Sequence, residues 1–286
     1  MKVRKGAGTL SIPLVSLRLC VLTFTGLLFL LLPGGCAKAP KHFTHKVLNP
    51  MTPVKNQGKT QLCWAYAMLA AIETEHIGRG DSVNLSPAYI GRMLDKEPGA
   101  PEKRRGMGKA LLNLMAKYGM VDYDAMPGMD DTIPCKVIAR GREYTPKEFA
   151  LSLCDSDEYI ALTSTPDKPY GEEVDIDFPD NWMHDRFLNV LMDTLLRKTV
   201  RAVRSHRGVC WESSGHAMAI VGLARDDDGH PFFVMKNSWG TSQPHQGLVY
   251  MSFGSFREKT LAVEMPRTVF FSDSTAEAAA PSEQLQ

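Results

Sequence analysis

A cysteine at the start of a helix constrains this chain more than any other feature of its sequence. Residues 53–80 (PVKNQGKTQLCWAYAMLAAIETEHIGRG) begin as a polar, glycine-containing loop and continue as a helical pattern that opens at Cys63. The pattern ends at Gly78 and Gly80. Because a helix N-terminus favours the thiolate, Cys63 is a candidate nucleophile with a pKa below the usual ~8.5. The alternative is a small buried apolar residue, as most lone cysteines are.

A second segment, residues 213–240, supplies partners for this thiol. His216 opens an alternating apolar run, and Asn237 follows a second such run after the turn at residues 226–229 (DDDG). This pattern predicts a β-hairpin that holds His216 and Asn237 side by side. The two residues follow Cys63 by about 150 and 170 positions, close to the ~130–150 of the papain and cathepsin arrangement.

Taken together, these motifs resemble those of the papain-like cysteine peptidases. The resemblance implies that Cys63 is the nucleophile, that His216 is the general acid/base and that Asn237 orients the imidazole ring. It also implies that the side-chain amide of Gln57 joins the backbone N–H of Cys63 in an oxyanion hole. Trp239, in Asn-Ser-Trp-Gly, matches the indole that shields the histidine–asparagine contact, and it is also a candidate substrate-binding residue.

The same resemblance implies an α+β fold of two lobes with the active-site cleft between them. A helical lobe is expected over about residues 57–130 and an antiparallel, β-barrel-like lobe over about 195–270. The peptidase domain then covers residues 53–270, and a linker at 37–52 precedes it, with His42 and His45 expected in solvent. The last segment, 271–286, is polar and of low complexity, which predicts disorder.

The N-terminus has the pattern of a secretory signal. Basic residues precede an apolar run at 19–32, which is shorter than the ~20 residues that a membrane-spanning helix needs. Cys36 follows Pro33-Gly34-Gly35 and resembles the lipid-carrying cysteine of a bacterial lipobox, although Pro33 departs from the usual aliphatic residue. We therefore expect residues 1–36 to direct export to the periplasm or outer surface of a bacterial envelope, with membrane attachment through a lipidated Cys36. The alternative, cleavage by an ordinary signal peptidase without lipidation, stays open. Little room remains for a long inhibitory propeptide.

Residues 84–87 (NLSP) predict a helix start, with Ser86 as the N-cap and Pro87 at the first helical position. A glycine-rich stretch then precedes a further helix of the predicted helical lobe, expected over residues 109–118. In papain-like enzymes the corresponding stretch lines the substrate cleft, so the resemblance makes Gly106, Met107 and Gly108 candidate substrate-binding residues. A simple helix-start loop is the alternative. The preceding residues, 97–105 (EPGAPEKRR), are expected to form a surface loop with a solvated basic pair.

The middle of the chain indicates a branch of the family. Residues 149–153 (FALSL), 158–164 (EYIALTS) and 178–182 (FPDNW) resemble the bleomycin hydrolase and aminopeptidase C branch. Thr60 supports the same branch, because it occupies the position at which papain-branch enzymes have a disulfide cysteine. The chain is too short for the insertion with which that branch builds hexamers, so a monomer is expected. The choice between endopeptidase and aminopeptidase stays open.

Composition and cysteine spacing exclude several other classes of function. A net charge of +1 gives no reason to expect a nucleic-acid partner. No Cys-x-x-Cys pair suggests zinc, and the acidic turn at 226–229 lacks the spaced ligands of a calcium loop, so neither a metal nor a cofactor is expected. Export permits disulfides, but the three remaining cysteines allow at most one bridge, whose pairing is open. These cysteines are Cys135, Cys154 and Cys210.

The predicted function is hydrolysis of peptide bonds in peptides or proteins through a thioester acyl-enzyme. Two alternatives stay open at this point. The protein can be a non-catalytic binding protein on the same scaffold, because one fold can host unrelated functions. An amine can also intercept the thioester, which would make the protein a thiol transpeptidase.

Overall fold

The computed structural model describes residues 42–272. The predicted signal segment, Cys36 and nearly all of the predicted polar tail lie outside these residues. Among the described residues, no helix is both long and apolar enough to cross a membrane. Cys63, Cys135, Cys154 and Cys210 are all free thiols, so the described part of the chain contains no disulfide.

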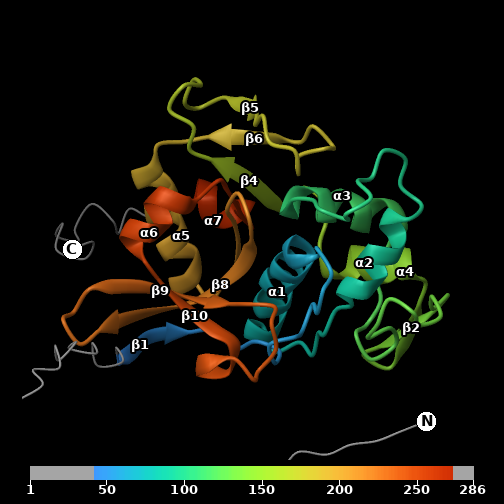
Figure 1. Ribbon diagram of the computed structural model, residues 1–286. Coiled ribbons are helices and arrows are strands. Elements are labelled where there is room, and N and C mark those ends of the chain that lie inside the picture. The colour runs from blue at the N-terminus through green and yellow to red at the C-terminus, as the bar shows by residue number, and fades with distance from the viewer. Residues whose placement is uncertain (1–41, 273–286) are drawn as a thin grey trace, which may run out of the picture. The chain divides into compact units, whose positions relative to one another are not determined.

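Helices α1 to α4 pack against one another, with α3 in contact with each of the other three (Figure 1). Helix α1 is buried along nearly its whole length, with an apolar first half and the buried polar residues Glu73–His76 in its second half, and it contacts both α3 and the sheet. Ser86 accepts a hydrogen bond from the Tyr89 N–H and so caps α2. Gly119, at a φ of 92°, ends α3. The helices predicted from Cys63, after Ser86 and over 109–118 are therefore confirmed. Their bounds are α1 Cys63–Gly78, α2 Pro87–Leu94, α3 Gly108–Tyr118 and α4 Pro146–Leu153.

The other side is built on one nine-stranded, mostly antiparallel sheet. Its order is β10-β9-β8-β7-β11-β4-β6-β5, with β1 also paired to β8. The strands are β1 Phe43–Leu48, β4 Tyr159–Thr163, β5 Glu173–Asp175, β6 Arg186–Asn189, β7 Val209–Glu212, β8 Ala217–Asp226, β9 Pro231–Lys236, β10 Leu248–Ser252 and β11 Ala262–Pro266.

Helices α5, α6 and α7 lie close together beside this sheet (Figure 1). Leu195, Leu196 and Val203 of α5 share a buried core with strands β7, β8 and β9. The remaining elements are the two-stranded sheet β2 Val137–Ala139 and β3 Arg142–Tyr144, and the helices α5 Met192–Arg204, α6 Phe253–Lys259 and α7 Arg267–Phe271. The 3₁₀ turn η1 Pro244–Gly247 precedes β10.

Two sequence predictions about this sheet need correction. Residues 43–48, expected in the linker, form strand β1 and pair antiparallel with β8, and the His45 ring hydrogen-bonds the Tyr250 hydroxyl at 2.8 Å. The β lobe also begins well before residue 195, because β4, β5 and β6 belong to the same sheet. All five residues of β4 are buried between β11 and β6, a pattern that gives no alternation for sequence analysis to detect.

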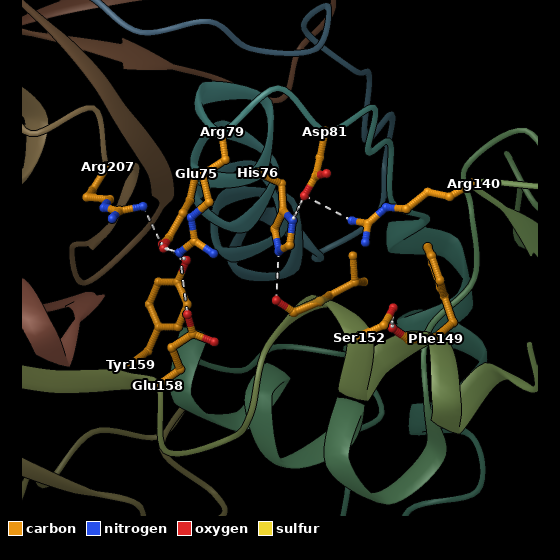
Figure 2. Close-up of polar contacts among 11 residues, drawn as sticks. Glu75, His76, Arg79, Asp81, Arg140, Phe149, Ser152, Glu158, Tyr159 and Arg207 are labelled. Carbon is orange, nitrogen blue, oxygen red and sulfur yellow. Dashed lines mark hydrogen bonds and ion pairs between the residues drawn. The ribbon is translucent and has the colours of Figure 1, made fainter.

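Polar contacts anchor the C-terminal end of α1 (Figure 2). The Nδ1 of His76 lies 2.8 Å from an Asp81 carboxylate oxygen, and its Nε2 lies 2.7 Å from the Leu153 carbonyl. Both ring nitrogens therefore face acceptors. Beside them the buried Glu75 accepts hydrogen bonds from the Tyr159 hydroxyl and from Arg207, each at 2.9 Å. These contacts tie α1 to α4 and β4 and so fix the direction of the helix that begins at Cys63.

Candidate active site

Cys63 is the first residue of α1, and its side chain is partly buried. Burial raises the pKa of the thiol above its ordinary value, and the charge of Glu212 adds to this. The backbone N–H groups of Ala217 and Trp64 point at the sulfur and oppose the rise, but they do not outweigh desolvation. The helix N-terminus therefore does not by itself lower the pKa of Cys63.

His216 and Asn237 lie side by side, as the hairpin pattern predicts. The Nε2 of His216 is 2.8 Å from Asn237 Oδ1. The backbone N–H of Ser238 donates to the same atom at 2.8 Å, so the atom must be the amide oxygen and His216 Nε2 must carry the hydrogen. In the neutral ring this leaves Nδ1 as the nitrogen that can accept a proton.

Burial lowers the pKa of His216, whereas its hydrogen bond to Asn237 raises it. An imidazolium alone is therefore disfavoured at this position, as a thiolate alone is at Cys63. Formation of both charges as a pair would offset these two costs.

Trp239 covers the imidazole. Its ring stacks on that of His216 with centroids 5.0 Å apart and an interplanar angle of 28°. The indole is 49% exposed, so its outer face is open to solvent while its inner face lies against the imidazole. Trp239 also bridges to Asn56 through the backbone, which ties the hairpin to the loop that precedes Cys63.

Gln57 is held in place by the same hairpin. Its Oε1 accepts a hydrogen bond from the Ser238 hydroxyl, and its backbone N–H donates to the Ser238 carbonyl at 2.8 Å. The Nε2 of Gln57 donates to the Thr60 carbonyl at 2.7 Å. A primary amide nitrogen carries two hydrogens, so one donor remains for another acceptor.

A fully paired ionic cluster lies below this loop, and we call it the Glu73 cluster. The side chain of Glu73 is completely buried and forms an ion pair with Lys55. Its other oxygen accepts from the Thr52 hydroxyl at 2.6 Å and lies 3.6 Å from Lys236 Nζ, while the Leu85 N–H donates to the first. Burial lowers the pKa of Lys236 to about 8. The cluster joins α1, which carries Cys63, to the loop at 52–57, which carries Gln57, and to the end of β9, which Asn237 directly follows.

Cys63 and His216 line one small cleft. Gly106 and Met107 also line it, and a Cβ at Gly106 would lie only 2.9 Å from the Trp64 ring. Gly108 lies behind the cleft wall, where its N–H donates to Glu212 at 2.8 Å. Of the predicted substrate-binding residues, Gly106 and Met107 thus line the cleft, whereas Gly108 supports its wall and Trp239 covers His216.

Comparisons with known proteins agree with this geometry. Residues 188–266 match the family model described as Papain family cysteine protease. The chain is 23% identical over 219 residues to ananain from Ananas comosus, covering 76% of this chain and 56% of the relative. It is also 23% identical over 224 residues to papain from Carica papaya, covering 78% and 58%. The chain therefore spans little more than half the length of these curated relatives.

A solved structure shows the shared fold. The crystal structure of pepw from Lactobacillus rhamnosis hn001 matches with a TM-score of 0.64 at 16% identity, covering 79% of this chain and 82% of that one. The chain therefore shares the papain-like fold and resembles papain-family cysteine proteases in sequence. The family model covers His216 and Asn237, and the matched relatives extend the similarity over about three-quarters of the chain.

This papain-like protein also has a cleft residue that sequence analysis missed. Arg105, expected in a solvated basic pair, forms a bidentate contact with Asp180 at 2.9 Å, and both residues line the cleft. The positive charge of Arg105 makes the smallest of the contributions that oppose the rise in the pKa of Cys63. The interpretation of Arg105 as solvated is wrong because Asp180 comes from a distant loop, which no local pattern reveals. The Trp182 indole donates to the Arg105 carbonyl at 3.0 Å and helps to fix the contact.

Proposed function

We propose that this papain-like protein is a cysteine peptidase that uses Cys63, His216 and Asn237. The observation that carries the proposal is the 2.8 Å contact between His216 Nε2 and Asn237 Oδ1, in a cleft that Cys63 also lines. The contact orients the imidazole so that Nδ1 is free to take the thiol proton. The proposal extends to no particular substrate sequence.

The chemistry begins with transfer of the Cys63 proton to His216 Nδ1, which creates the thiolate and imidazolium as a pair. The sulfur attacks the scissile carbonyl carbon, and the carbonyl oxygen becomes an oxyanion. The Cys63 backbone N–H and the second amide hydrogen of Gln57 donate to it. His216 then returns its proton to the leaving amine as the C–N bond breaks, which leaves a thioester on Cys63. Water, deprotonated by His216, hydrolyses the thioester and restores the thiol.

Each flanking residue has a defined part in this scheme. Asn237 needs only to hold the ring, so a neutral amide suffices. Gln57 contributes one oxyanion donor, and removing such a donor typically costs ~10²–10³ in kcat. Gln57→Ala is therefore expected to lower kcat by about that factor with a small change in KM. Cys63→Ala is expected to abolish turnover.

The test compares the full chain with Cys63→Ala and with Cys154→Ser, a matched control because Cys154 is a partly buried thiol that does not line the cleft. Each protein is incubated with peptides that have free or acetylated N-termini. Cleavage by the parent and the control, lost in Cys63→Ala, supports the proposal. Cleavage of both peptide types indicates an endopeptidase, and cleavage of free-amine peptides alone indicates an aminopeptidase.

Two outcomes contradict the proposal. Full activity in Cys63→Ala removes the assigned nucleophile. Failure of the parent to cleave any peptide or to react with a peptidyl epoxide favours a non-catalytic binding protein. If an added amine becomes joined to the acyl part of the cleaved peptide, and the free carboxylic acid is not released, the enzyme is a transpeptidase.

A further inference from the structure

One thiol and two carboxylates gather at the inner wall of the cleft, and we call them the β7–β11 cluster. Cys210 and Glu212 lie two residues apart on β7, so their side chains point to the same face of the sheet. Glu264 on β11 is the direct cross-strand partner of Cys210. One ligand atom from each residue lies within 4.8 Å of the other two, and all three residues are buried.

The carboxylate oxygens of this cluster lack partners. Among the described residues, neither oxygen of Glu264 has a hydrogen bond, and neither does Oε2 of Glu212. Only Glu212 Oε1 is satisfied, by the Gly108 N–H at 2.8 Å. Folded proteins pair nearly all buried polar atoms, so three orphaned oxygens in one place indicate a missing partner.

Gly108 borders the cluster and limits what can enter. A Cβ at this position would lie 2.7 Å from Glu264 Oε2 and 3.1 Å from Cys210 Sγ. The cluster therefore closes directly on the backbone of Gly108, which leaves no room there for the carbon stem of a lysine or arginine side chain. The absent partner is therefore best matched by a metal ion.

We propose that Cys210, Glu212 and Glu264 bind a Zn²⁺ ion. A thiolate with two carboxylates suits zinc, which takes sulfur and oxygen ligands in small tetrahedral sites. Calcium and magnesium prefer six or more oxygen ligands, which the cluster lacks. Zinc bond lengths of ~2.0–2.3 Å imply ligand atoms roughly 3.3–3.7 Å apart, which a small contraction of the cluster provides. The Gly108 N–H already orients Glu212, as outer-shell donors orient metal ligands.

The site has an entry path and a structural consequence. Glu212 lines the cleft next to Cys63, so an ion reaches the cluster from the cleft. Once bound, zinc joins β7 to β11 and, through Gly108, to the start of α3. No Cys-x-x-Cys pair signals this site along the chain, because strand pairing brings its residues together. The ion is independent of the proposed peptidase chemistry, whose steps run without it.

The test uses the full chain with Cys63→Ala, which removes the thiol of the cleft itself. The protein is dialysed against ZnCl₂ in a metal buffer, and bound zinc is counted by mass spectrometry. CoCl₂ is then substituted, and the near-ultraviolet absorption band of cobalt–thiolate bonding is recorded. We expect one equivalent of metal per chain, the thiolate band, and a higher Tm with zinc than with chelator.

Variants locate the ion. Cys210→Ser is expected to remove the cobalt–thiolate band. Glu264→Gln is expected to weaken zinc binding by at least ~100-fold, since even outer-shell partners are worth 10–100-fold. Cys154→Ser, in the same Cys63→Ala background, is the matched control and should bind metal like its parent.

Three results would overturn the proposal. The first is the absence of stoichiometric metal in the Cys63→Ala chain. The second is binding that Cys210→Ser and Glu264→Gln both leave unchanged. The third is a protein that stays metal-free while Glu264→Gln, on the otherwise unchanged chain, alters the cleavage of peptides with basic side chains. That result would make the cluster a subsite for a substrate cation.

Discussion

Two groups of buried carboxylates flank the catalytic elements, and they are built in opposite ways. Glu73 is completely buried, and both of its oxygens are satisfied by cations, a hydroxyl and a backbone N–H. Glu212 and Glu264 are equally buried, yet three of their four oxygens have no hydrogen bond among the described residues. A buried carboxylate that stabilises the scaffold is paired with cationic side chains of the protein. A buried carboxylate without such partners indicates a binding site for a cation.

The largest effect is expected for Glu73→Leu. The substitution leaves the ammonium groups of Lys55 and Lys236 without their buried counterion, and breaking a buried pair in this way typically costs ~3–5 kcal/mol. Urea unfolding of the variant and the parent measures the loss. A change under about 1 kcal/mol would mean that the Glu73 cluster does not anchor the scaffold.

An intermediate effect is expected for Lys236→Met, because Glu73 keeps Lys55, Thr52 and the Leu85 N–H. The loss should be roughly 1–3 kcal/mol at neutral pH. The pKa of Lys236 is lowered to about 8 in the folded state, so the unfolded chain binds more protons between about pH 8 and the ordinary lysine pKa. The contribution of Lys236 to stability therefore rises with pH across this window.

Unfolding free energies at several pH values, from 7 to about 10, test this sign. The difference in stability between the parent and Lys236→Met should grow with pH. A difference that shrinks as the pH rises would show that Lys236 gains, rather than loses, proton affinity on folding.

The smallest effect on stability is expected for Glu264→Gln measured in chelator. Glu264 forms no ion pair with a described residue, so the substitution breaks none. Replacing one of the two neighbouring buried carboxylates, Glu212 and Glu264, by a neutral amide is expected to lower stability by less than ~1 kcal/mol, or to increase it. Urea unfolding in the presence of EDTA checks this against Glu73→Leu. A loss of stability as large as that of Glu73→Leu would show that the β7–β11 cluster stabilises the scaffold as much as the Glu73 cluster does.

How far the sequence predicts this molecule depends on whether a feature is local. The helix at Cys63, the Ser86 cap and the hairpin between His216 and Asn237 all follow from short patterns, and the structure has them. The two-lobe fold was expected only because the motifs resemble those of papain-like enzymes, and no local pattern in the sequence predicts it.

Features made by distant chain segments could not be predicted. Strand β1 looked like a linker because its pairing with β8 depends on residues far along the chain. The contact of Arg105 with Asp180 and the pairing of Cys210 with Glu264 also depend on tertiary structure. The pKa of Cys63 was misjudged because burial is a property of the fold. The assignments of signal, lipidation, tail and family branch stay predictions.

Covalent labelling of Cys63 tests the central claim most directly. The full chain, Cys63→Ala and the matched control Cys154→Ser are each treated with a peptidyl epoxide at limiting concentration, and adducts are mapped by peptide mass spectrometry. The account predicts one adduct, on Cys63, in the parent and in Cys154→Ser. It also predicts loss of peptide cleavage in proportion to that adduct. Labelling of Cys63→Ala at the same rate, or full cleavage by the labelled parent, would contradict it.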